Sequence, residues 1–386
     1  RRCQSRTPLQ RFRISRKKNL TVSDLVTSAW CEMKFWYSLT RYGMVKKTPA
    51  MKQGTRIHRK LEEQVHVSVP VKVKIAEDTL GLQILNVIQG LRTLQKHGQT
   101  RELHVWGMVD GNLVGGKIDE LSYSGPIIIS SNKNEESDIS KMQCAEKDTI
   151  DVLSTTDNTE NTIASSLEKK FDPQSVYLSD VKTRSVRRLP SDTEFRPTKY
   201  QLMLYHRFIS ILATDKFDLS ILTSHFNLDP HKIFSDEFLA QVNSLEEEEN
   251  TRFIDGNDLN YQQTQSMILK HNNISALWSL MISEFQSAFP NGVESLGNTL
   301  IVEFRLAKNG KIIGTKTFPM DDLDLTAYLK HAMEWWNGER PPQGVTIEEA
   351  YKCRTCEFAD ACNWRLQKAE ESRIQFRRKR SHTVNN

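Results

Sequence analysis

The sequence of 386 residues lacks any long apolar run. A helix that spans a bilayer needs about 20 consecutive apolar residues. Hydrophobic residues make up only 38% of this chain, and charged residues make up 26%. We therefore expect no membrane span and no membrane partner. A chain of this length can bury a substantial core, so we expect a globular, soluble monomer.

Acidic residues are missing from residues 1–18, which carry eight Arg and Lys. Organellar targeting segments and nucleic-acid-binding arms share this composition, so residues 1–18 are interpreted as a basic arm of either kind. The sequence begins without Met. A second basic cluster lies at 377–380, and we expect residues 368–386 to form a basic, solvated tail.

Cysteine is also scarce, with six in the chain. No secretory signal is evident, so we expect a thiolate metal site rather than a disulfide framework. Cys3 lies in the basic arm and Cys144 in a polar stretch, and both are interpreted as incidental. The spacing of the other four fits either zinc or a [4Fe–4S] cluster. These four are Cys31, Cys353, Cys356 and Cys362.

Aromatic residues are few between residues 130 and 172, where ten acids accompany five bases. Such a stretch cannot offset its ordering entropy by burying apolar surface. The sequence predicts a disordered insert at 130–172, inside a single folded domain that covers residues 19–367.

Two helices are predicted ahead of the first strands. The first covers 20–39, begins at Thr21 or Ser23, and carries the first of the four cysteines. The second covers 51–66, where His58 shares a face with residues four positions away.

Strands are predicted next, at 101–123, with turns at both Asp110-Gly111 and Gly115-Gly116. After the insert, a short strand at 175–185 precedes a helix at 196–213. Further along the chain, Asn309-Gly310 predicts a hairpin and Gly338 ends another helix.

Two carboxylates on neighbouring predicted strands suit a hard divalent cation. Asp119 and Asp180 supply oxygen ligands of the kind that Mg²⁺ or Mn²⁺ prefers. Strand residues two apart share a face, so Lys182 lies beside the metal held by Asp180. A metal lowers the pKa of a bound water, and an ammonium stabilises the charge that develops on a phosphate. The pattern therefore favours metal-dependent phosphodiester hydrolysis.

The order of these motifs resembles the RecB-type branch of the PD-(D/E)XK nucleases, an α/β fold with a central mixed sheet flanked by helices. The resemblance implies His58, Asp119 and Asp180 as metal ligands and Lys182 as a catalytic residue. It also implies Gln201 and Tyr205 beside the active site, although Tyr205 also suits a core aromatic. The matching stretches are "GTRIH" (54–58), "GGKIDEL" (115–121), "SDVKTR" (179–184) and "QLMLY" (201–205).

One cysteine before these motifs and three after them resemble the arrangement in the exonuclease V family. That resemblance implies a [4Fe–4S] cluster on the four cysteines, which clips the ends of the fold together. It also implies an exonuclease that degrades single-stranded DNA from its ends in DNA maintenance or repair. Fungal members act in mitochondria, which favours a mitochondrial location here, with the nucleus as the alternative.

Competing interpretations remain at this stage. Arg184, Arg187 and Arg188 are candidates for binding DNA phosphates, and solvated surface explains them equally well. A catalytically silent nucleic-acid-binding protein with the same fold and cluster is the alternative function, and an iron–sulfur electron carrier is a third. Single-stranded DNA is the expected partner, and a single-strand-binding protein is a candidate second partner.

Overall fold

A computed structural model of the chain describes residues 6–16, 19–42, 49–63, 70–123, 125, 175–252 and 267–384. The predicted disordered insert at 130–172 lies outside the described residues. Within them, no helix combines the length and the apolar character that crossing a membrane requires.

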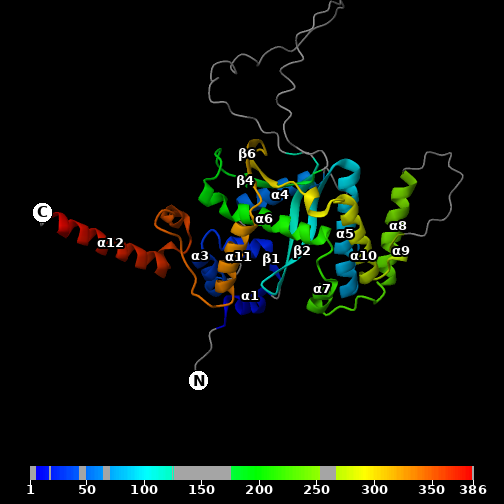
Figure 1. The fold of residues 1–386 in the computed structure, drawn as a ribbon, viewed down its shortest axis with the longest axis horizontal. Helices are drawn as coiled ribbons and strands as arrows, with labels where there is room; N and C mark the ends of the chain where they lie inside the picture. Colours follow the sequence, from blue (N-terminus) through cyan, green and yellow to red (C-terminus); the bar gives the residue numbers. More distant parts are fainter. Residues whose placement is uncertain are drawn as a thin grey trace, which may run out of the picture.

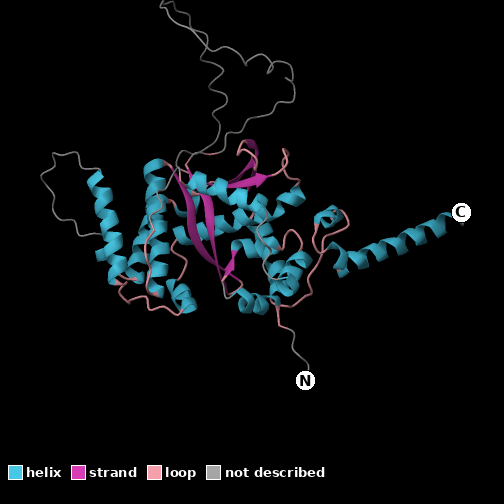
Figure 2. Ribbon diagram, turned by 180° about the vertical axis from the view of Figure 1, so that it is seen from behind, coloured by secondary structure: helices cyan, strands magenta, loops and turns pink. Residues whose placement is uncertain are grey.

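A mixed sheet of six strands lies at the centre of the fold, with helices on both sides of it (Figure 2). Neighbouring strands run antiparallel, except that β1 is parallel to β3 and β4 is parallel to β5. The mixed α/β architecture expected from the sequence is therefore confirmed. The strands are β1 (Leu20–Thr21), β2 (Gln99–Val109), β3 (Asn112–Ser122), β4 (Tyr177–Arg184), β5 (Thr299–Leu306) and β6 (Ile312–Pro319).

The sheet divides along one edge of β3. β2 pairs with β3 over its whole length, whereas two strands share the opposite edge. β1 pairs with Val114 and Gly115, and β4 pairs only with 120–122. Residues 116–119 of β3 therefore have no partner on that edge among the described strands, and the sheet opens there.

The described part of the chain has twelve α-helices, and Figure 1 shows α5 and α10 side by side. The helices are α1 (Pro8–Arg16), α2 (Val22–Thr27), α3 (Glu32–Tyr37), α4 (Pro49–Glu62), α5 (Ala76–His97), α6 (Asp192–Ala213), α7 (Leu219–Phe226), α8 (Asp236–Arg252), α9 (Met267–Lys270), α10 (Ile274–Ala288), α11 (Asp322–Trp336) and α12 (Asn363–Val384).

Helix α6 packs on β2 and β4, and two of its aromatic rings lie against glycines of β2 and β3. A Cβ at Gly107 would lie 2.2 Å from the Phe208 ring, and one at Gly116 would lie 2.5 Å from the Tyr205 ring. These glycines let the aromatic side chains of α6 approach the backbone of the sheet. The close approach fixes α6 on the strands that carry the predicted active site.

The turn prediction at 101–123 is correct at one position and wrong at the other. Asp110 and Gly111 have φ values of 48° and 69°, as a two-residue hairpin turn requires. Gly115 and Gly116 form no turn and lie inside β3. Gly116 instead leaves space for the ring of Tyr205. A rule based on neighbouring residues cannot predict this long-range contact. The later hairpin at Asn309-Gly310 is confirmed.

The prediction of one helix over 20–39 is wrong. Thr21 caps α2 and forms a capping box with Asp24, as predicted, but the helix ends at Thr27. Cys31 has extended backbone angles, φ −174° and ψ 114°, and α3 begins after it. The break turns the thiol of Cys31 toward a distant part of the chain, described below, so a tertiary contact overrides the helical pattern.

The basic segment at the start of the chain contributes to the core. Helix α1 places the fully buried Phe12 edge-on against Trp336 of α11, with ring centroids 5.5 Å apart. At the other end, α12 extends away from the rest of the fold (Figure 1) and includes most of the predicted tail.

Candidate active site

Helix α4 places His58 at the opening in the sheet. Ile57 and Leu61 of α4 pack on Val181 of β4 and form a small apolar cluster. On the same helix, Nδ1 of His58 lies 3.4 Å from Oδ2 of Asp119. The helical spacing thus buries two apolar residues and turns the imidazole toward the carboxylate.

Asp119 holds the two diverging strands together. Its Oδ2 accepts a hydrogen bond from the backbone N–H of Val181 at 3.1 Å. This bond replaces the ladder hydrogen bond that is lost where β4 leaves β3. The structure therefore brings Asp119 next to the D-x-K triplet, across the 61 residues between Asp119 and Asp180.

Asp180 is 2% exposed and lies beside Lys182. The ammonium of Lys182 donates to Oδ1 of Asp180 at 2.9 Å. It also lies 2.8 Å from Oδ2, but without hydrogen-bond geometry, so Oδ2 is a buried oxygen with no hydrogen bond. Oδ2 is thus in ion-pair contact with Lys182 and keeps lone pairs that a further ligand can use.

The pKa values of this pair follow from burial and from the charges around it. Burial raises the pKa of Asp180 to about 7, and the nearby Asp119 adds to the rise while Lys182 opposes it. Burial alone lowers the pKa of Lys182, but Asp180 and Asp119 reverse this effect and leave it raised. Lys182 is therefore an ammonium at neutral pH.

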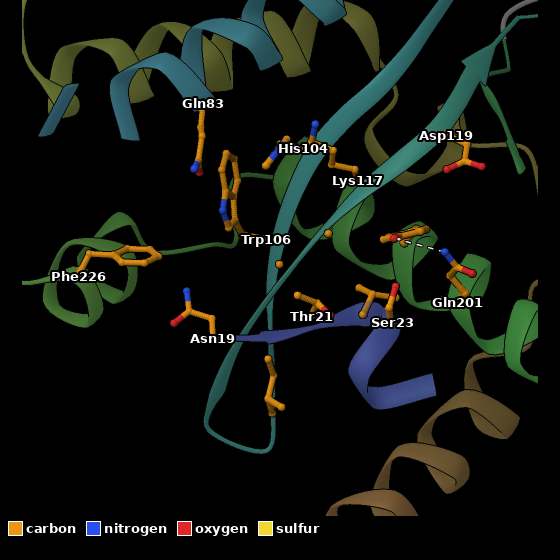
Figure 3. A pocket seen from close by; sticks show the side chains of 15 residues that line it. Asn19, Thr21, Ser23, Gln83, His104, Trp106, Lys117, Asp119, Gln201 and Phe226 are labelled. Carbon is orange, nitrogen blue, oxygen red and sulfur yellow. Dashed lines mark hydrogen bonds between the residues drawn. The ribbon is translucent and has the colours of Figure 1, made fainter. Parts of the chain in front are cut away.

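Helix α6 supplies the other contacts of Lys182. Its Nζ donates to Oε1 of Gln201 at 3.1 Å, and Nε2 of Gln201 donates to the Tyr205 hydroxyl at 3.5 Å (Figure 3). Burial raises the pKa of Tyr205 to about 12, so its hydroxyl stays protonated. Gln201 and Tyr205 thus lie beside the candidate active site, and Tyr205 is a core aromatic as well.

Glu102 joins the site, although the sequence analysis did not include it. The pairs on either side, 101 with 120 and 103 with 118, put Glu102 across from Asp119, and one ligand atom from each of His58, Glu102 and Asp119 lies within 4.8 Å of the others. Its φ of 54° is unusual for a residue in a strand. The sequence does contain a signal for Glu102. A two-residue turn at Asp110-Gly111 fixes the register of the hairpin, and this register puts residue 102 across from residue 119.

The predicted DNA-binding arginines differ in their surroundings. Arg184 and Arg188 both donate to Glu194 in the first turn of α6, at 3.1 and 3.0 Å. Arg187 is exposed and has no ion pair among the described residues. Arg187 is thus the most available of the three to a ligand.

The four cysteines expected to act together gather at one place. Burial raises the pKa of the Cys31 thiol, and the three thiols of the later segment raise it further. Among the described residues, no three thiol sulfurs lie within 4.8 Å of one another. A single tetrahedral zinc with Zn–S bonds of about 2.3 Å needs sulfurs about 3.8 Å apart. Apolar neighbours include Met33, Tyr37, Phe358 and Trp364.

A buried lysine connects the cysteine segment to α6. The ammonium of Lys352 lies 2.6 Å from Oε2 of Glu349 and donates to the carbonyl oxygens of Trp30 and Thr193 at 3.5 and 3.4 Å. The carbonyl of Thr193 is available because Pro197, one turn later, has no N–H to donate. One side chain therefore ties the segment before Cys31, the start of α6 and the cysteine segment together.

Comparisons with known proteins identify the family of the chain. A family model described as "Exonuclease V - a 5' deoxyribonuclease" matches residues 7–365. "Exonuclease V" of Danio rerio is 24% identical over 379 residues, which cover 97% of this chain and 77% of that protein. "Exonuclease V, mitochondrial" of Candida dubliniensis is 24% identical over 453 residues, covering 89% of this chain and 71% of that protein. The chain belongs to the exonuclease V family.

Proposed function

We propose that this protein is a metal-dependent exonuclease that degrades single-stranded DNA from its ends, with a RecB-type PD-(D/E)XK active site. Membership of a family described as a 5′ deoxyribonuclease supports DNA as the substrate and the 5′ end as the starting point. The observation that carries the proposal is the buried Asp180 carboxylate between a second carboxylate and the Lys182 ammonium, with an Oδ2 that accepts no hydrogen bond.

The residues present fit a hard divalent cation. His58, Glu102 and Asp119 converge, and Asp180, which lies outside that group, offers a buried oxygen near Asp119 and Lys182. Carboxylate oxygens and one imidazole suit Mg²⁺ or Mn²⁺, which keep several waters for the substrate to displace. When bound, such a metal supplies a water of lowered pKa and neutralises charge on the scissile phosphate.

Lys182 acts in this proposal as a fixed positive charge and hydrogen-bond donor. Asp180 and Asp119 raise its pKa and so favour the ammonium, which donates hydrogen bonds and accepts no proton. Gln201 accepts a second hydrogen bond from Nζ, so the ammonium is oriented before substrate arrives. A charge that needs no reorganisation stabilises developing negative charge on the phosphate most effectively.

The four cysteines are proposed to hold a [4Fe–4S] cluster. The mutual influence of the four thiols on the pKa of Cys31 supports a shared site, and four thiolates are the ligand set of a [4Fe–4S] cluster. Binding at these residues would join the segment at Cys31 to a segment more than 320 residues later. We propose a structural role, which secures α6 and the catalytic residues that it carries.

The cellular setting is proposed from the relatives. Fungal relatives are named mitochondrial, among them the Eremothecium gossypii protein, which is 23% identical and covers 90% of this chain. A mitochondrial role in DNA maintenance or repair follows, with the nucleus as the alternative. A single-strand-binding protein is a proposed partner.

A cleavage assay separates this function from a catalytically silent binding protein. End-labelled single strands are incubated with the purified protein and Mg²⁺, and with the Asp180→Asn and Lys182→Ala variants. We expect the native protein to shorten the strands and each variant to do so at least 100-fold more slowly. Binding without shortening by the native protein would establish the silent alternative, and equal rates for the variants would disprove the proposed active site.

A further inference from the structure

A cavity of about 670 Å³ begins at the catalytic residues and extends along the sheet. Figure 3 shows Asp119 and Gln201 at one end and Phe226 at the other, with Trp106 between them. Ligand sites have volumes of roughly 300–1,000 Å³, so this space is large enough for a nucleotide. The catalytic residues described above lie only at the Asp119 end of this cavity.

The floor of this cavity is a face of the β2–β3 hairpin. Opposite residues in an antiparallel pair point to the same side, and the register pairs His104 with Lys117 and Trp106 with Gly115. These pairs follow the pair of Glu102 and Asp119 at intervals of about 7 Å. Successive phosphates of an extended single strand have a similar spacing.

The second pair along the floor has the chemistry to hold a phosphate. The side chain of Lys117 is 50% exposed, and its Nζ lies 3.8 Å from Oε2 of Glu102. A flexible ammonium at a cavity wall is a suitable donor to a phosphate oxygen. Beyond it, Gly115 leaves the floor open, since an added Cβ would meet no atom closer than 3.6 Å.

Phe226 at the far end is an exposed ring held in place. It is 43% exposed, the last residue of α7. The His225 ring packs edge-on against it, with centroids 5.2 Å apart, and His225 is hydrogen-bonded to Asn19. Asn227 then ends the helix with φ of 54°. An aromatic ring that is exposed and fixed is the platform on which single-strand-binding proteins stack bases.

We propose that this cavity is the strand-binding groove next to the scissile bond, in which Lys117 binds the adjoining phosphate and Phe226 stacks on a base. The inference rests on the proposed nuclease function, because the strand is placed relative to the catalytic residues. The ligand is a single strand of DNA rather than a duplex, since a base within a base-paired stack has no free face to offer Phe226.

Binding is measured in the Asp180→Asn background, which holds the strand without cleaving it. Fluorescence anisotropy of an end-labelled single strand gives the dissociation constant. Phe226→Ala should weaken binding roughly tenfold, the loss expected for one stacked base. Phe376→Ala on α12, a ring 67% exposed and far from the cavity in sequence, is the matched control and should leave binding unchanged.

A series of DNA strands identifies the stacked base. Each strand has one abasic position, which lies one nucleotide further from the 5′ end than in the strand before. At one position the abasic strand should bind roughly tenfold more weakly, and Phe226→Ala should then cause no further loss. Additive losses at every position would overturn the stacking, as would equal weakening by Phe376→Ala. Binding of a mononucleotide as tightly as the strand would show a product site and overturn the strand groove.

The phosphate contact is tested by salt. For a single strand, each phosphate contact contributes about 0.7 to the slope of log affinity against log salt concentration. Lys117→Gln should lower that slope by about 0.7, and an unchanged slope would refute the contact. If the native protein cleaves strands while both variants bind like their background, the groove is wrong and the nuclease stands. If the native protein neither cleaves nor binds strands, both proposals fail.

Discussion

Asp180→Asn is expected to stabilise the metal-free protein while it abolishes cleavage. The folded state raises the pKa of this carboxyl from 3.8 to about 7, and burial is the main cause. A tenfold change in protonation equilibrium corresponds to about 1.4 kcal/mol, so the ionised carboxylate costs the folded state up to about 4 kcal/mol above pH 7. Asn mimics the protonated acid and removes this cost.

The effect has a defined pH window. Between pH 4 and pH 7 the folded state binds the proton that the unfolded state has released, so the stability of the native protein falls as pH rises. Below pH 4 both states are protonated, and the variant has no advantage there. The difference in unfolding free energy should therefore grow from near zero at pH 4 to its full value at pH 8.

Urea unfolding with a chelator present measures this difference, followed by far-ultraviolet circular dichroism. Asp192→Asn is the matched control, because its side chain is 99% exposed, and it should change stability by less than about 1 kcal/mol at either pH. Added Mg²⁺ should then raise the unfolding free energy of the native protein more than that of the Asp180→Asn variant. A variant less stable than the native protein at pH 8 without metal would refute the reasoning.

Three more predictions concern the rest of the fold. Cys31→Ala should lose iron and lower the unfolding midpoint as much as Cys356→Ala, and full iron content by metal analysis would contradict the shared site. Lys352→Met should destabilise the protein by about 2 kcal/mol in urea unfolding, because two buried carbonyls lose their donor and Glu349 keeps only its ion pair with Arg196, and a change below 1 kcal/mol would contradict this. Gly107→Ala should cost about 1–3 kcal/mol by crowding Phe208, whereas Gly111→Ala, with open space around it, should show only backbone strain.

The local features of the catalytic centre are visible in the sequence. Alternation along a strand is enough to put Asp180 and Lys182 side by side, and helical spacing is enough to put Gln201 near Tyr205. The turn at Asp110-Gly111 is equally local, because only certain residues tolerate its backbone angles. These predictions depend on neighbours a few residues apart, and the structure confirms them.

Features that depend on distant residues escaped the local rules. Gly115 and Gly116 suggested a turn, but Gly116 is a glycine because Tyr205, some ninety residues later, occupies the space of a side chain. The helical pattern at 20–39 continues through Cys31, yet the backbone extends there and its thiol meets three others from the end of the chain. In both places long-range packing outweighs a local preference of about 1 kcal/mol.

By itself, the sequence determined which chemistry is possible: the D-x-K triplet, the second carboxylate, the histidine and the two groups of cysteines. Only the tertiary structure decided how these parts meet. It opened the sheet between β1 and β4, brought Glu102 and His58 to Asp119, and left Oδ2 of Asp180 buried without a hydrogen bond. The physical reason is that burial and electrostatic coupling depend on every element that packs around a group, whereas local propensity depends only on its neighbours along the chain.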